Sequence, residues 1–203
     1  EKQANGGILM TITEKIQTAA DYLLSRISLR PTVGLILGSG LGDYADTLEN
    51  SISIPYAQIP SFPLPTVPGH SGAMVFGYKC GRPVVVLQGR IHYYEGLPMQ
   101  EITLPVRVLA AMGVKTLILT NSAGGVNTSF HPGDLMLLSD HINYSGMNPL
   151  IGPNLDAFGP RFPDMSNAYD KDLQALAQEI AKQENISIEK GVYLMVSGPN
   201  FET

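Results

Sequence analysis

This chain of 203 residues has little of three things, and each scarcity excludes a class of protein. Cys80 is the only cysteine, so an internal disulfide is impossible and a reducing, cytoplasmic setting is the simplest expectation. No apolar run approaches the roughly 20 residues of a membrane-spanning helix, so we expect no membrane partner. Basic residues number 13 against 18 acidic ones, a net charge of −5, which argues against a nucleic-acid partner.

Several catalytic and metal-binding motifs are also missing. The histidines show neither H-x-x-x-H nor H-E-x-x-H spacing, and with a single cysteine we expect no metal site. No G-x-S-x-G motif occurs, which disfavours an α/β-hydrolase. The glycine-rich stretch 38–42 is not followed by Lys-Ser or Lys-Thr, so it is not a Walker A loop.

The apolar pattern predicts an α/β fold with a mixed central β-sheet flanked by helices. A hydrophobic content of 44% allows one sizeable core, and we expect residues 1–203 to form a single domain. The chain stops directly after a predicted strand with no closing helix, and we expect it to be truncated at its C-terminus. We expect strands at 33–37, 51–54, 73–78, 83–87, 115–120, 134–139 and 191–196, and helices at 13–28, 98–110 with a break at Pro105, and 173–181.

The segment after the predicted strand 83–87 carries the strongest functional signal. Arg90 and His92 lie just past the strand end, where open α/β sheets bind ligands. If the backbone stays extended, both side chains point the same way, and Tyr94 continues the alternation. A guanidinium and an imidazole suit a small oxyanion such as phosphate, and a tyrosine suits a sugar. The alternative is a surface arginine and a core histidine.

Three further segments follow predicted strands and carry weaker signals. Backbone N–H groups of the Gly38–Gly42 loop could hold an anion, with the Ser39 hydroxyl as a further donor; the alternative is a tight turn. The small residues after Asn121 would let a flat ligand lie close to the backbone, or would simply form a packing turn. Glu202 beside Phe201 could bind a planar N–H edge, although a solvated carboxylate is the simpler explanation. Together, the four segments could form one pocket for a phosphate, a sugar and a flat base.

At this point the chain resembles the trimeric purine nucleoside phosphorylases. The resembling stretches occur in the family's order over nearly the whole chain, and they are specific as a set: 37–42, 67–72, 89–96, 120–125, 161–166 and 197–203. The resemblance implies phosphorolysis of 6-oxopurine nucleosides to free base and ribose 1-phosphate, in purine salvage. It also implies a homotrimer that uses inorganic phosphate as co-substrate and needs no cofactor.

The resemblance further implies roles for individual residues. Ser39, Arg90 and His92 match phosphate-binding positions, with His70 nearby and a backbone contribution at Ser122. The residues implied for the sugar and the base are Tyr94 for ribose, Phe162 for the ribose site of a neighbouring subunit, and Ala123, Gly124, Phe201 and Glu202 for the purine. His92 and Glu202 are the expected catalytic residues.

Two other readings stay open on the sequence. The first is a related phosphorylase that acts on methylthioadenosine or xanthosine, although Glu202 would meet the N1 lone pair of an aminopurine unfavourably. The second is a nucleoside-binding or assembly module without turnover. The family continues past the segment that ends at Thr203 and supplies further phosphate-, base- and ribose-binding residues there, so we expect these 203 residues alone to be weakly active or inactive.

Overall fold

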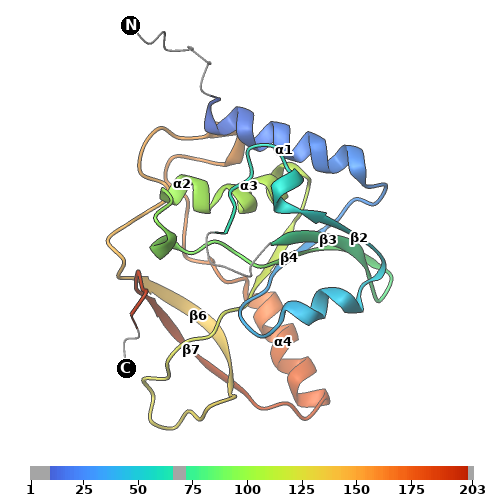
Figure 1. Cartoon of the computed structure of the whole chain (residues 1–203). Coiled ribbons are helices and arrows are strands. Elements are labelled where there is room, and N and C mark those ends of the chain that lie inside the picture. Colours follow the sequence, from blue (N-terminus) through green and yellow to red (C-terminus); the bar gives the residue numbers. More distant parts are fainter. Residues whose placement is uncertain (1–9, 66–71, 201–203) are drawn as a thin grey trace, which may run out of the picture. The chain divides into compact units, whose positions relative to one another are not determined.

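A computed structural model describes residues 10–65 and 72–200 of the chain. The chain divides into two compact units, with the division along the chain between Ser122 and Ala123, and each is described on its own. Figure 1 labels most of their helices and strands. The predicted site residues His70, Phe201 and Glu202 lie outside the described residues. Among the described residues, no helix is both long and apolar enough to cross a membrane.

The first unit is built on a mixed five-stranded sheet with the strand order β2-β3-β4-β1-β5. Its strands are β1 (Val33–Ile36), β2 (Glu49–Pro55), β3 (Ala73–Lys79), β4 (Arg82–Gln88) and β5 (Thr116–Leu119). Strand β1 runs parallel to β4 on one side and to β5 on the other, whereas β3 is antiparallel to its two neighbours. The predicted mixed α/β architecture is therefore confirmed, and the carboxyl ends of β1, β4 and β5 share one edge of the sheet.

Side chains cover both faces of the sheet at its central strands. On one face, Val84 and Val86 of β4 pack in a buried cluster with Ala45 and Leu48, which belong to or follow the 3-10 helix η1 (Gly42–Thr47). On the other face, β1 approaches helix α3 (Leu104–Ala111) so closely that a Cβ on Gly34 would lie 3.2 Å from a methyl group of Leu109. A strand covered on both faces is apolar throughout, which is why β4 was recognisable as a continuous valine-rich run.

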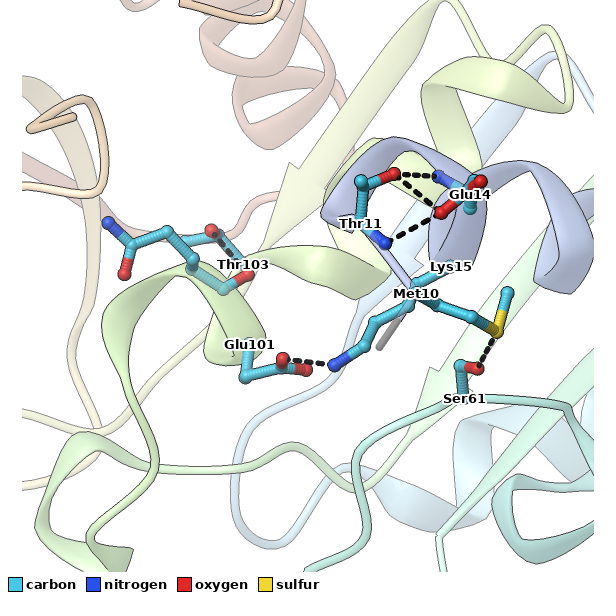
Figure 2. A network of polar contacts seen from close by, with 8 residues as sticks. Met10, Thr11, Glu14, Lys15, Ser61, Glu101 and Thr103 are labelled. Carbon is cyan, nitrogen blue, oxygen red and sulfur yellow. Dashed lines mark hydrogen bonds and ion pairs between the residues drawn. The ribbon is translucent and has the colours of Figure 1, made fainter. Parts of the chain in front are cut away.

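Helix α1 (Ile12–Arg26) begins at a capping box, as the Thr11 and Glu14 spacing indicates. The Thr11 hydroxyl accepts a hydrogen bond from the Glu14 backbone N at 3.2 Å, and the Glu14 carboxylate accepts one from the Thr11 backbone N at 2.7 Å. One turn later, Lys15 Nζ lies 2.6 Å from a carboxylate oxygen of Glu101 in α2 (Met99–Ile102) (Figure 2). This ion pair and the packing of α1 on α3 hold the helices of the unit together.

The predicted break at Pro105 is confirmed. Helices α2 and α3 are separated at Thr103, and Pro105 occupies the first turn of α3. Proline has no N–H to donate within a helix but is tolerated in a first turn, so the chain restarts there instead of continuing.

The second unit contains a two-stranded parallel sheet and one long helix. Strands β6 (Leu135–Asn143) and β7 (Ile188–Met195) pair with each other, and α4 (Lys171–Gln183) comes between them in the chain. Asp170 caps the N-terminus of α4, where its carboxylate accepts a hydrogen bond from the Leu173 backbone N at 2.9 Å. Residues 148–163 form a long loop in which the only regular element is the short 3-10 helix η4 (Asp156–Phe158).

Candidate functional site

Three loops leave the shared edge of the five-stranded sheet and meet at Thr120. The Gly38–Gly42 loop follows β1, Arg90 follows β4, and Thr120 follows β5. The Thr120 hydroxyl accepts a hydrogen bond from the Gly38 backbone N at 2.8 Å, while its carbonyl oxygen accepts one from Arg90 Nη1 at 2.9 Å. Thr120 thus joins three of the four predicted segments, whereas the fourth, at Glu202, lies outside the described residues.

The glycine-rich loop is held at both of its ends. A Cβ on Gly38 would lie 2.7 Å from the Thr120 carbonyl oxygen and 2.9 Å from the Asn121 Cα, so only glycine fits against this backbone. At the far end, Gln88 Nε2 donates to the Gly42 carbonyl oxygen at 3.1 Å. Ser39 lies between these anchors and is exposed, so its hydroxyl is available to a ligand.

The His92 ring is oriented by Glu95, three residues later in the chain. The Glu95 carboxylate accepts a hydrogen bond from the His92 backbone N at 2.7 Å, and its oxygen lies 3.2 Å from His92 Nδ1. The Glu95 side chain is only 2% exposed, whereas that of His92 is 36% exposed. Glu95 therefore engages the Nδ1 side of the ring, and Nε2 is the ring nitrogen left for a ligand.

The predicted alternation of side chains ends at His92, and its extension to Tyr94 was wrong. His92 has extended backbone angles, but Tyr93–Glu95 forms the 3-10 helix η3. A helical turn does not place every second side chain on one side. Tyr94 nevertheless returns to His92, because the two rings stack with centroids 4.9 Å apart and planes 11° apart. Tyr94 therefore lies beside the His92 imidazole because of a helical turn and ring stacking, and not because of an extended backbone.

Sequence reasoning missed three residues that organise this site. Glu95 could have been found, because an acidic residue three positions after the first residue of a turn has capping-box spacing. Thr120 and Tyr56 gave no local signal, because their partners lie 82, 30 and 33 residues away in the chain. Tyr56 is buried and its hydroxyl donates to the Gly89 carbonyl oxygen at 2.6 Å; burial raises its pKa.

The other predicted residues that the structure describes, Ser122, Ala123, Gly124 and Phe162, are exposed. Ser122 ends the first unit, and Ala123 and Gly124 open the second in a stretch without helix or strand. Phe162 is 88% exposed, which is unusual for a large apolar side chain. Within residues 10–65 and 72–200, no group of three or more His, Cys, Asp or Glu side chains could hold a metal ion.

This arrangement of strands and loops matches a known class of protein. The family model of the phosphorylase superfamily matches residues 32–203, most of the chain. Purine nucleoside phosphorylase 1 of Bacillus subtilis is 55% identical over 190 residues, which cover 94% of this chain and 70% of that protein. The purine nucleoside phosphorylase of Bos taurus is 50% identical over 195 residues, covering 94% of this chain and 68% of its own length.

Solved structures agree with these relatives. A crystal structure of a purine nucleoside phosphorylase in complex with ribose-1-phosphate superposes with a TM-score of 0.91 at 45% identity, covering 96% of this chain and 74% of that one. The Schistosoma mansoni enzyme in complex with inosine gives a TM-score of 0.90 at 44% identity, with 96% and 70% covered. The chain therefore belongs to the purine nucleoside phosphorylases of the phosphorylase superfamily.

Proposed function

We propose that this chain catalyses the phosphorolysis of 6-oxopurine nucleosides, in which inorganic phosphate attacks the anomeric carbon and releases the free base and ribose 1-phosphate. Such a reaction classes the protein as a pentosyltransferase of purine salvage. The observation that carries the proposal is the junction at Thr120, which brings the glycine loop and Arg90 together at one edge of the sheet. Relatives with the same fold have been solved with ribose-1-phosphate and with inosine, the product and substrate of this reaction.

The phosphate site is proposed to consist of Ser39, Arg90 and His92, with the backbone at Ser122 and the side chain of His70 as further donors. A net charge of −5 means that phosphate must be attracted by a few placed donors, not by the overall field of the protein. Arg90 supplies a permanent charge with a forked set of N–H donors. Nε2 of His92 is the ring nitrogen proposed to contact phosphate, since Nδ1 is engaged by Glu95.

A phosphate held in this way supports the reaction in two respects. Placing it next to the anomeric carbon removes much of the entropic cost of bringing two reactants together. As the glycosidic bond breaks, the sugar acquires oxocarbenium character, and the bound anion stabilises that positive charge. The departing purine gains negative charge, and hydrogen bonding by Glu202 to its N1–H edge is the proposed means of holding it.

The sugar and base sides of the site are proposed on the resemblance, supported by the exposure of Tyr94, Ala123, Gly124 and Phe162. Tyr94 is proposed to contact the ribose next to the phosphate, and its stacking on His92 supports this. Phe201 and Glu202, with the small residues Ala123 and Gly124, are proposed to hold the purine. The 88% exposure of Phe162 supports its proposed role at the ribose site of a neighbouring subunit, and hence a homotrimer. We further propose that residues 1–203 belong to one phosphorylase domain, cytoplasmic and without a cofactor.

A base-release assay tests the function directly. The natural protein that carries these 203 residues is incubated with inosine, guanosine or adenosine, with and without phosphate. We expect hypoxanthine and guanine to be released only when phosphate is present. Release of adenine without hypoxanthine would instead indicate a phosphorylase for aminopurine nucleosides, and tight nucleoside binding without any release would indicate a non-catalytic module.

Arg90 provides the test of the site. Replacing it with alanine (Arg90→Ala) removes a charged hydrogen bond, worth about 1.5–3 kcal/mol, so the KM for phosphate should rise about 10- to 150-fold. Arg26→Ala is the matched control, because Arg26 is exposed in the last turn of α1, where its guanidinium carbon lies 5.0 Å from the centre of the Tyr22 ring. An Arg90 variant with an unaltered phosphate KM would remove this residue from the site.

A further inference from the structure

Tyr56 is a buried tyrosine to which the reaction assigns no role. It begins the 3-10 helix η2 (Tyr56–Gln58) directly after β2 and is 1% exposed. Its ring packs against Phe62, with centroids 4.8 Å apart and planes tilted by 47°. A tyrosine this deeply buried needs a partner for its hydroxyl, because an unpaired hydroxyl would be costly away from water. The partner of the Tyr56 hydroxyl therefore indicates which part of the structure this residue stabilises.

The partner is the carbonyl oxygen of Gly89, which accepts the Tyr56 hydroxyl at 2.6 Å. Gly89 follows the last residue of β4 and has a φ of +94°, in a region that L side chains rarely adopt. This residue makes the turn by which the chain leaves the strand and continues into Arg90 and His92. The Tyr56 hydroxyl thus holds the turn that leads into Arg90 and His92, the two residues predicted to bind phosphate.

The same ring also supports a second backbone segment at this position. The Tyr56 backbone N donates to the Gly72 carbonyl oxygen at 3.1 Å, and a Cβ on Gly72 would overlap the tyrosine ring. A Cβ on Gly89 would lie 3.5 Å from the Gly72 Cα. Tyr56 therefore packs against two glycine backbones that adjoin each other, one before β3 and one after β4, and limits the movement of the Gly89 turn.

We propose that Tyr56 is a positioning residue of the phosphate site, whose hydroxyl sets the orientation of the Gly89 peptide and thereby the placement of Arg90 and His92. This inference rests on the proposed function. Because Tyr56 is buried, it acts through the turn and does not touch substrate. A purely structural tyrosine would lower stability when altered, whereas a positioning tyrosine also weakens phosphate binding selectively.

Tyr56→Phe tests the proposal, since it keeps the ring against Phe62 and Gly72 and removes only the hydroxyl. We expect the KM for phosphate to rise about tenfold, equivalent to about 1.4 kcal/mol, with the KM for inosine and kcat at saturating phosphate changing less than about twofold. Calorimetric titration of each variant with inorganic phosphate should show the same loss of affinity. Gly89→Ala disturbs the same turn from the other side and should reproduce this selective effect, which keeps the test decisive if Tyr56→Phe folds poorly.

Two control variants separate positioning from stability. Phe62→Leu loosens the packing behind the ring but leaves the hydroxyl bond, so it should lower the melting temperature without changing the KM for phosphate. Tyr22→Phe on α1 controls for the loss of a tyrosine hydroxyl elsewhere. The positioning role would be overturned if Tyr56→Phe kept the phosphate KM and phosphate affinity of the unaltered protein. It would also be overturned if the KM for phosphate, the KM for inosine and kcat all worsened by the same factor. If the unaltered protein bound phosphate but released no base, the proposed function would fail, while the phosphate affinities would still decide the role of Tyr56.

Discussion

A single methyl group at Gly38 should separate the glycine-rich loop from Thr120. In Gly38→Ala the new Cβ would lie 2.7 Å from the Thr120 carbonyl oxygen, 2.9 Å from the Asn121 Cα and 3.1 Å from the Thr120 carbonyl carbon. All three atoms belong to the backbone, so no side chain can rotate away. To reach the 3.4 Å of an ordinary contact, the two segments must move apart by roughly 0.7 Å.

This movement should be visible both in stability and in catalysis. Overpacking of this kind costs about 1–3 kcal/mol, and for a chain of this size each kcal/mol lowers the melting temperature by about 2–4 °C. Misplacement of reacting groups by about 1 Å can cost about a hundredfold in rate. We therefore expect a lower melting temperature in calorimetry and a fall in kcat/KM for phosphate of about ten- to a hundredfold.

Gly42→Ala is the matched control within the same loop. Its Cβ would meet only the flexible side chain of Gln88, at 3.8 and 3.9 Å, so the substitution should leave both the melting temperature and the phosphate KM nearly unchanged. The reasoning would be refuted if Gly38→Ala kept the melting temperature and the phosphate KM of the unaltered protein. It would also be refuted if the Gly42 variant proved as damaging as the Gly38 variant.

Three further outcomes follow from the same contacts. Thr120→Val keeps the shape of the side chain but leaves the Gly38 N–H without its acceptor. Urea unfolding should therefore show a free energy of unfolding lower by about 1–3 kcal/mol, and the phosphate KM should rise. Thr120→Ser keeps the hydroxyl, so its stability and phosphate KM should be close to those of the unaltered protein. Glu95→Gln removes the charge that orients His92, and steady-state kinetics should show the KM for phosphate rising more than that for inosine; equal changes in both would contradict this orientation. Burial raises the pKa of Tyr56 above its ordinary value of 10.0, so the unfolded chain loses this proton first, and unfolding measured against pH should show stability falling above about pH 10. That part of the fall should be missing from Tyr56→Phe, and identical pH profiles would refute the assignment.

Local sequence patterns were enough to find most of the secondary structure. The valine-rich run at β4, the capping box at Thr11 and the proline that restarts the chain at α3 each act through residues within one turn or one strand. The motifs after β1, β4 and β5 were likewise visible, because small or charged residues after an apolar run stand out in any single sequence. These features depend on near neighbours in the chain, so the sequence by itself determined them, and with them the family resemblance.

The tertiary structure alone decided how these pieces meet. Strand β1 lies between β4 and β5, so that Val33 is opposite Val84 on one side and Thr116 on the other. Local sequence patterns do not specify pairing between residues so far apart in the chain. The roles of Thr120 and Tyr56 arise only from that pairing, because a threonine or tyrosine acquires a partner across the sheet without any change in its own neighbours. Likewise, a 3-10 turn at Tyr93–Glu95 is found where the spacing predicted side chains alternating along an extended backbone. The Glu95 carboxylate stabilises this turn by its contacts with the His92 backbone N and ring Nδ1.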